Sequence, residues 1–205
     1  MSAFPCRKLV LATSNQHKVR ELTGLLHSLR MPLVSLADFA SVRPVAENGT
    51  TLAENARGKA TGYARSLGEW VLADDTGLEV DILGGAPGVR SARFAGKNAT
   101  MAENRARLLE ELAGVPLSAR TARFVCHLAV ADPAGKIVAD AMGMCRGRIQ
   151  LEASGGEFGF GYDTLFEIIE YRRTLAELGS AATAMIGHRG RGVRRLLCAM
   201  SVGAD

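Results

Sequence analysis

The stretch KLVLATSNQHKVREL (residues 8–22) changes its residue pattern in the middle, and that change predicts how the fold begins. Residues 8–13 are a short, mostly apolar run with the length of a buried strand. Ser14 and Asn15 are residue types that favour the cap position before a helix. Apolar residues then recur at helical spacing at Val19, Leu22, Leu26 and Leu29. We therefore expect a strand, a tight turn and a helix.

The remaining chain alternates between helical and strand patterns. Expected helices cover about residues 51–67, a segment starting near Thr100, where Thr100 and Glu103 can form a capping box, and residues 191–200. Expected strands cover residues 70–73, 124–130, 137–144 and 165–169, with a glycine- and proline-bearing loop at residues 84–96. We expect residues 124–130 to be half-exposed and to form a hairpin with the next strand. This order predicts an α/β fold with a mixed sheet.

Composition limits the classes of protein to which the chain can belong. The 205 residues suffice for one domain, with or without two lobes, and 47% are hydrophobic, as in ordinary soluble globular proteins. Its 25 Lys and Arg against 21 Asp and Glu give a net charge of +4, far from the charge density of a nucleic-acid-coating protein. The four scattered cysteines predict reduced, buried thiols. Because no long apolar run occurs, we expect a cytoplasmic protein without membrane association.

Residues 13–18 (TSNQHK) lie at the expected helix start, which makes them a candidate anion site. A helix start presents unpaired backbone N–H groups and the positive end of the helix dipole. Lys18 falls in the first turn, where a cation is unfavourable unless an anion compensates it. The alternative is an ordinary surface lysine.

Asp74, Asp75 and Thr76 follow the expected strand at residues 70–73 and form a second candidate site. Ligands bind at the carboxyl ends of strands in open α/β sheets. Because consecutive strand residues point to opposite faces, one carboxylate is expected to face a ligand while the other fixes the turn. The ligand-facing one could hold Mg²⁺ or activate water, and the alternative is a turn that ends the strand. Glu47 and Lys59 could join this site only if their segment lies beside it.

Two later stretches contain further candidates. GGEFGFGYD (residues 155–163) alternates aromatics with glycines in a chain that is only 5% aromatic; we expect Phe158 to pack inward and residues 160–163 to form a ligand pocket. His188 and Arg189 precede the expected last helix, and Arg offers a rigid fork of donors. Alternatives for that pair are a solvated helix start or a nucleic-acid contact, although no aromatic side chains are interleaved for base stacking.

Together and in this order, these motifs resemble the inosine/xanthosine triphosphate pyrophosphatase family. The matching blocks are LATSNQHKVREL (11–22), ENGTTLAENARGKA (47–60), LADDTGLEVDILGGAPGVRSARFAG (72–96), FGYD (160–163) and IGHRG (186–190). The resemblance covers nearly the whole chain. It implies one bilobal domain over residues 1–205, with an elongated mixed sheet, flanking helices and a central cleft. It also implies a homodimer and Mg²⁺-dependent hydrolysis of ITP, dITP or XTP to the monophosphate and pyrophosphate.

The resemblance also implies a role for each matching residue. Asp75 would be the catalytic carboxylate and, with Glu47, a metal ligand. The triphosphate would bind Thr13, Ser14, Asn15, Gln16, His17, Lys18 and Lys59, with Thr76 beside the substrate. Phe160, Gly161, Tyr162 and Asp163 would frame the base, and His188 and Arg189 would contact its 6-oxo edge.

The sequence departs from the family pattern in several positions. Thr183 replaces a lysine that the family commonly has, Gly187 replaces a serine, and Thr164 replaces a proline. Ser14 and Thr76 also stand where the family usually has Gly and Ser. Two alternatives therefore stay open: a related pyrophosphatase for other modified or pyrimidine nucleotides, and a nucleotide-binding protein with little turnover.

Overall fold

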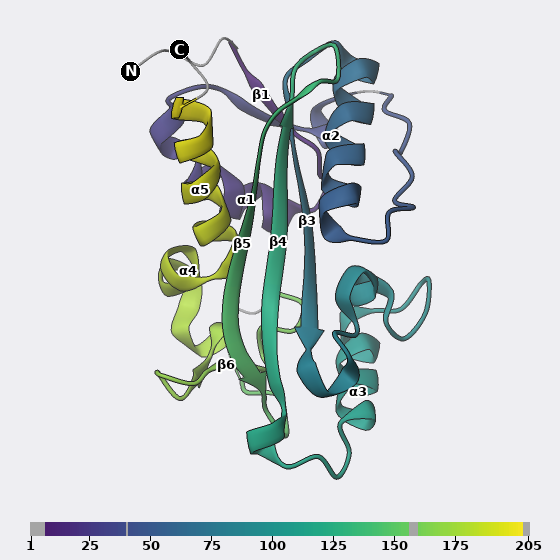
Figure 1. The fold of residues 1–205 in the computed structure, drawn as a ribbon, viewed down its shortest axis with the longest axis vertical. Coiled ribbons are helices and arrows are strands. Elements are labelled where there is room, and N and C mark those ends of the chain that lie inside the picture. The colour runs from purple at the N-terminus through teal and green to yellow at the C-terminus, as the bar shows by residue number, and fades with distance from the viewer. Residues whose placement is uncertain (1–6, 40, 156–159, 203–205) are drawn as a thin grey trace. The chain divides into compact units, whose positions relative to one another are not determined.

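The computed structural model describes residues 7–39, 41–155 and 160–202, and its strands form one seven-stranded sheet of order β2-β1-β3-β4-β5-β6-β7 (Figure 1). The strands are β1 Leu9–Leu11, β2 Leu33–Ser35, β3 Val71–Val80, β4 Thr121–Ala131, β5 Ile137–Ile149, β6 Phe166–Ile168 and β7 Arg173–Thr174. β1 pairs in parallel with β2 and β3, whereas β6 pairs antiparallel with β5 and β7. The predicted α/β fold with a mixed sheet is confirmed.

Five α-helices accompany these strands in the described part of the chain. They are α1 Gln16–Leu25, α2 Leu52–Leu67, α3 Met101–Glu111, α4 Leu175–Ile186 and α5 His188–Val202. Short 3-10 helices cover His27–Leu29, Leu36–Asp38, Asp81–Leu83, Gly88–Arg93 and Leu117–Ala119. Asn15 caps α1, and α2 and α3 begin with the capping boxes that their sequences contain. No described helix is long and apolar enough to span a membrane.

The chain divides into two compact units. Unit 1 comprises residues 1–75, 126–143 and 189–205, and unit 2 comprises residues 76–125 and 144–188. Strands β3, β4 and β5 contribute residues to both units. The single bilobal domain with a cleft stays a prediction.

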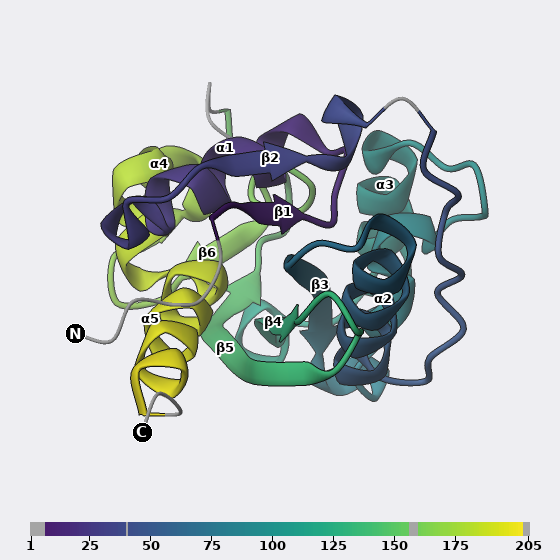
Figure 2. The ribbon, with the colours of Figure 1, turned by 90° about the horizontal axis from the view of Figure 1, so that it is seen from above.

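In unit 1, helices cover both faces of the strands, which are therefore buried on both sides. Leu9, Leu11 and Leu72 pack with apolar residues of α1 and α5, while Val10 and Ala73 pack with the alanine-rich face of α2. This alternation follows from the two-residue period of a strand. In Figures 1 and 2, α2 accordingly lies on one side of β3 and β4, and α5 lies on the other.

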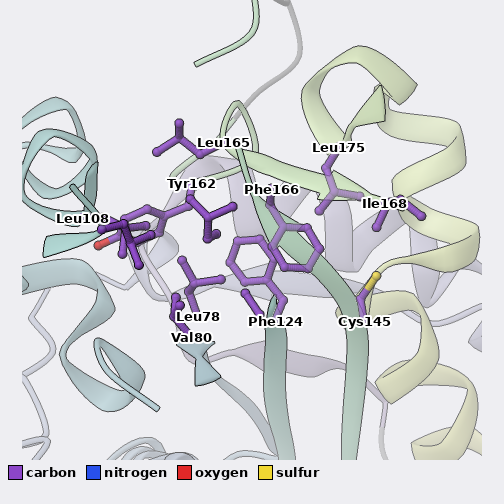
Figure 3. Close-up of a cluster of buried hydrophobic side chains, with 13 residues drawn as sticks. Leu78, Val80, Leu108, Phe124, Cys145, Tyr162, Leu165, Phe166, Ile168 and Leu175 are labelled. Atoms are coloured by element: carbon purple, nitrogen blue, oxygen red, sulfur yellow. The ribbon is translucent and has the colours of Figure 1, made fainter. Parts of the chain in front are cut away.

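Unit 2 has its own apolar core, which is drawn in Figure 3. The core combines Leu78 and Val80 of β3, Leu108 of α3 and the rings of Phe124 and Phe166, with further buried residues at Ala122, Leu112, Cys145, Ile149, Tyr162, Leu165, Ile168 and Leu175. The centroids of the Phe124 and Phe166 rings are 4.7 Å apart. Unit 2 therefore has an apolar interior of its own, to which aromatic side chains contribute.

Four expectations about the fold are wrong or incomplete. β3 does not end before Asp74 but continues to Val80. β4 is buried on both faces over most of its length rather than half-exposed, since it lies between β3 and β5. α5 starts at His188, so His188 and Arg189 belong to the helix instead of preceding it. Cys126 and Cys145 are buried as expected, but Cys198 is exposed.

Candidate active site

Asp75 of β3 lies in a polar cluster built by unit 1. Lys59 of α2 donates from Nζ to Asp75 Oδ1 at 2.8 Å and to the Asp74 carbonyl at 3.0 Å. Asn55, one helical turn earlier, donates from Nδ2 to Asp75 Oδ2 at 3.2 Å. Glu47 lies in the segment before α2, with its Oε1 3.6 Å from Lys59 Nζ. Two carboxylates therefore share one ammonium group.

Burial and charge act in opposite directions on this pair. Burial raises the pKa of the Asp75 carboxyl above its ordinary value, and nearby Glu47 adds to the rise, while Lys59 opposes it. Burial would lower the pKa of Lys59, but the carboxylates of Asp75, Glu47 and Asp74 outweigh that effect and raise it. Lys59 is thus a persistent cation, and Asp75 is a buried carboxylate that gains from further positive charge.

Asp74, on the opposite face of β3, has a different set of partners in unit 1. Its Oδ2 atom is 2.9 Å from Arg189 Nε and 3.2 Å from Lys18 Nζ. Arg189 also forms an ion pair through Nη1 with Glu21 of α1. Burial would lower the pKa of Arg189, but Asp74 and Glu21 raise it instead. Asp74 therefore joins α1 and α5 to the sheet.

The start of α1 has the geometry that the sequence predicts. Asn15 Oδ1 accepts hydrogen bonds from the backbone N–H groups of His17 at 2.9 Å and Lys18 at 3.4 Å. Thr13 Oγ1 in turn accepts the Asn15 N–H at 3.1 Å. The anion that compensates Lys18 in the structure is Asp74. Burial lowers the pKa of His17, against the attraction of Glu21.

The residues at this helix start differ in their solvent exposure. Ser14 and Gln16 are exposed, whereas Thr13, Asn15 and Lys18 are half-buried. Whether these groups bind phosphate remains a prediction.

In unit 2, residues 160–163 form a turn, named the FGYD turn below. Phe160 is 39% exposed, whereas Tyr162 is only 2% exposed and belongs to the core of the unit. The Tyr162 hydroxyl donates to the Ser91 carbonyl at 2.9 Å, and burial raises the pKa of this phenol. Asp163 Oδ2 accepts the Phe160 N–H at 3.1 Å. Of this turn, Phe160 offers the accessible ring, while the ring of Tyr162 supports the turn from within; Phe158 lies outside the described residues.

His188 and Thr76 are the other predicted site residues in unit 2. His188 is buried, and its ring stacks on Phe124 with centroids 4.8 Å apart and an interplanar angle of 23°. Thr76 is half-buried in β3 directly after Asp75. Arg189 follows His188 in the chain but has its ion pairs in unit 1, so the two neighbours have distinct surroundings.

The sequence reasoning missed two residues of these clusters. Asn55 binds Asp75, and Glu21 binds Arg189. A signal existed for Asn55, because it lies four residues before Lys59 on the same helix face. Glu21 is 168 residues from Arg189 and no local pattern connects them.

Known proteins resemble this chain over almost its full length. A protein of Desulforamulus reducens named dITP/XTP pyrophosphatase is 49% identical over 93% of this chain and 94% of its own. One of the same name from Rhodopirellula baltica is 46% identical over 91% of this chain and 89% of its own. A solved HAM1 protein from Coxiella burnetii superposes with a TM-score of 0.85 at 36% identity, covering 95% of this chain and 98% of that one.

A fourth relative both has a solved structure and carries the name of the enzyme. The crystal structure of a nucleoside-triphosphatase (dITP/XTP pyrophosphatase) from Mycobacterium abscessus has a TM-score of 0.74 at 38% identity, covering 93% of this chain and 98% of that one. The sequence profile of the Ham1 family matches residues 9–199. With a family match of that length, and relatives this similar over more than nine-tenths of the chain, the chain belongs to the Ham1 family.

Proposed function

We propose that the protein hydrolyses deaminated purine nucleoside triphosphates (ITP, dITP and XTP) to the monophosphate and pyrophosphate, with Mg²⁺ as cofactor. The cluster of Asp75, Lys59 and Glu47 carries this proposal, in a chain whose relatives are named dITP/XTP pyrophosphatase. A buried carboxylate beside an ammonium group suits a reaction that places phosphate charge next to an activated water.

The donor set of the cluster fits the proposed metal. Mg²⁺ prefers oxygen ligands and is commonly bound by one or two carboxylates together with substrate phosphates. Asp75 and Glu47 supply these carboxylates, and we assign the ion to them. When bound, Mg²⁺ would neutralise charge that develops on the phosphate oxygens. Among the residues that the structure describes, no group of three or more His, Cys, Asp or Glu forms a candidate metal site, so the substrate would complete the ligand set.

The residues of unit 1 supply the other parts of the reaction. A water oxygen attacks the α-phosphorus, the bond to the bridging oxygen of the β-phosphate breaks, and pyrophosphate leaves with that oxygen. We assign Asp75 as the group that receives the proton of the water, and Lys59, which hydrogen-bonds to Asp75 and remains charged, as the group that stabilises the phosphate oxygens. We assign the start of α1, with Lys18, to the triphosphate.

We assign the base to the FGYD turn, His188 and Arg189. Inosine and xanthosine carry a 6-carbonyl acceptor where adenosine carries an amino donor, so a buried donor directed at that position is satisfied by the first and opposed by the second. A buried unpaired donor costs about 1–3 kcal/mol, which corresponds to roughly 10- to 100-fold discrimination against adenine. Pocket shape must exclude the 2-amino group of guanine.

Pyrophosphate release from a panel of nucleotides tests the proposal. With Mg²⁺, ITP, dITP and XTP should yield monophosphate and pyrophosphate, and ATP should be a much poorer substrate. Release of single phosphate, or equal turnover of ITP and ATP, would overturn the proposal. Thermal stabilisation by ITP without any pyrophosphate would instead identify a nucleotide-binding protein with little turnover.

One observation favours a second candidate, a related pyrophosphatase for other modified or pyrimidine nucleotides. Thr183 stands where the family commonly has a lysine, and its hydroxyl donates to the Gly179 carbonyl at 2.9 Å. This side chain therefore brings no cation to the base side. Preference for pyrimidine or other modified triphosphates in the same assay would support this candidate.

We also propose that the protein acts as a homodimer in the cytoplasm, without nucleic acid as a partner, as the family resemblance implies. Light scattering on the purified protein tests the dimer. A monomer at micromolar concentration would contradict it.

A further inference from the structure

The FGYD turn is held in place by a residue to which neither the sequence motifs nor the proposed reaction assigns a role. Arg105 of α3 donates from Nη1 to the carbonyl of Gly161 at 2.7 Å. Both residues belong to unit 2. Gly161 has a φ of 67°, a left-handed conformation that glycine adopts without strain. Arg105 therefore binds the turn at its conformationally special residue.

Buried hydrogen bonds and a capping box hold the helix segment that carries Arg105. The neighbouring Asn104 is fully buried; its Oδ1 accepts the Ala95 N–H at 2.8 Å, and its Nδ2 donates to the Ala92 carbonyl at 3.1 Å. The capping box of Thr100 and Glu103 fixes the start of the same helix. A charge-assisted bond from such a support is among the stronger hydrogen bonds and is directional.

The turn has a second anchor on its other side. The hydroxyl of Tyr162 donates to the carbonyl of Ser91. Ser91 Oγ accepts the Leu78 N–H at 2.8 Å and donates to the Gly88 carbonyl at 2.6 Å. Arg105 and Tyr162 thus connect consecutive residues of the turn to α3 and, through Ser91, to β3.

We propose that Arg105 is a positioning residue for nucleobase recognition, acting through the Gly161 carbonyl to orient the FGYD turn and the exposed ring of Phe160. This inference rests on the proposed function, which assigns that turn to the base. The residues that we assign to phosphate and metal belong to unit 1, whereas Arg105 binds the turn assigned to the base, so we expect it to act on binding of the base and to leave the chemical step unchanged.

The chain offers a matched control on the same helix. Arg107 is exposed and pairs with Glu110 and Glu111 of its own helix. We compare Arg105→Met with Arg107→Met, using dITP as substrate and inorganic tripolyphosphate as an inhibitor that has no base. Arg105→Met should raise KM about 10-fold, as expected for loss of one charge-assisted hydrogen bond, with kcat within about twofold. Tripolyphosphate inhibition should not change. Arg107→Met should match the wild type in all three quantities.

Two further variants separate positioning from general loss of structure. Arg105→Lys keeps a cationic donor and should recover part of the KM. Tyr162→Phe removes only the hydroxyl that reaches Ser91, so it should also raise KM. It replaces Arg105→Met as the test variant if Arg105→Met does not fold. Equal KM for Arg105→Met and Arg107→Met, a fall in kcat alone, or weaker tripolyphosphate inhibition would each overturn the inference.

Amide hydrogen exchange needs no turnover, so it tests the role of Arg105 independently of the proposed function. Amide hydrogen exchange in residues 160–165 should be faster in Arg105→Met than in Arg107→Met. If the wild type releases no pyrophosphate, the proposed function fails while this comparison still decides whether Arg105 holds the turn. Unchanged exchange would show that it does not.

Discussion

Asp74 and Asp75 are consecutive residues of β3, and their side chains point to opposite faces of the sheet. The Asp74 side chain is completely buried and has two cationic partners, Lys18 and Arg189. The Asp75 side chain is 11% exposed, and the cation that it pairs with, Lys59, is shared with Glu47. The ion pairs around Asp74 thus join two carboxylates, Asp74 and Glu21, to two cations, whereas those around Asp75 join two carboxylates to a single ammonium group.

This difference shows how one motif can serve two purposes. A buried carboxylate with two cations is a structural group, because removing it leaves buried charges without compensation. A carboxylate that shares its paired cation with a second carboxylate can accept a divalent ion or a proton at little cost to its neighbours. We therefore expect changes at Asp74 to affect mainly stability and changes around Asp75 to affect mainly turnover.

The largest effect on stability is expected for Asp74→Asn. Lys18 would then lose its ion pair with Asp74, while Arg189 would keep its pair with Glu21, and breaking a buried ion pair typically costs about 3–5 kcal/mol. For a chain of this size the melting temperature should fall by roughly 6–20 °C, measured by circular dichroism. Glu69→Gln is the control, because the Lys8–Glu69 pair is exposed and should contribute about 1 kcal/mol or less. Equal shifts in both variants would contradict the structural role of Asp74.

Lys59→Met should have the next largest effect, on catalysis. It removes the cation that binds Asp75 and that we assign to the phosphate oxygens, so kcat/KM for dITP should fall about 100-fold or more. Lys8→Met, which alters an exposed ion pair of unit 1, should retain wild-type kcat/KM. A folded Lys59→Met variant with nearly full activity would exclude Lys59 from the reaction.

A smaller loss is expected for Asn55→Ala. The amide of Asn55 holds Asp75 Oδ2 and also accepts the Gly49 N–H at 2.8 Å, so its loss loosens the carboxylate without removing charge. We expect kcat/KM to fall about 10-fold. Asn48→Ala, at an exposed position of the same segment, serves as the control. If both variants lose the same activity, the effect lies in the loop and not in Asp75.

The smallest effect is expected on how the melting temperature of the metal-free protein depends on pH. Burial raises the folded pKa of Asp75 above its unfolded value, so ionising this group costs stability. The cost is absent below the ordinary pKa of about 3.9 and is complete once pH exceeds the raised folded pKa. The melting temperature of Asp75→Asn relative to wild type should therefore rise with pH across that window. A relative fall would mean that the attraction of Lys59 outweighs burial.

Local patterns predicted much of the fold. The apolar run before Asn15, the helical pattern of residues 51–67 and the capping box at Thr100 located β1 and the starts of α1, α2 and α3. The sequence also contains a capping box at Thr174 and Glu177 that marks the start of α4, a helix missing from the expectations. Helix starts were predictable because their hydrogen bonds join residues three positions apart.

The errors come from interactions between distant residues. Two adjacent carboxylates suggest the end of a strand, but β3 continues because Lys59, Lys18 and Arg189 neutralise them. The last helix was expected from residue 191, but α5 begins at His188. Inside it, a Cβ added at Gly192 would come within 2.9 Å of Cys126 Sγ in β4, so this glycine allows close packing of the helix against the sheet, which only the partner strand reveals.

Several residues of the candidate site could be predicted from the sequence, but the ion pairs and packing contacts of those residues could not. Asp75, Lys59 and Glu47 were identified, and the structure brings them together. Tyr162 was expected in a ligand pocket, and the structure places its ring in the core of unit 2. The ion pair of Arg189 with Asp74 spans 115 positions of the chain, and only tertiary structure reveals it.

The most direct test compares pyrophosphate release from dITP by Asp74→Asn and Asp75→Asn, at a low temperature where both variants show native circular dichroism. We predict that Asp75→Asn loses about 1000-fold or more in kcat/KM, since the assigned proton acceptor and metal ligand is gone. Folded Asp74→Asn should stay within about 10-fold of wild type. An Asp75→Asn variant within 10-fold of wild type, or equal losses in the two variants, would contradict the division of roles between the two carboxylates.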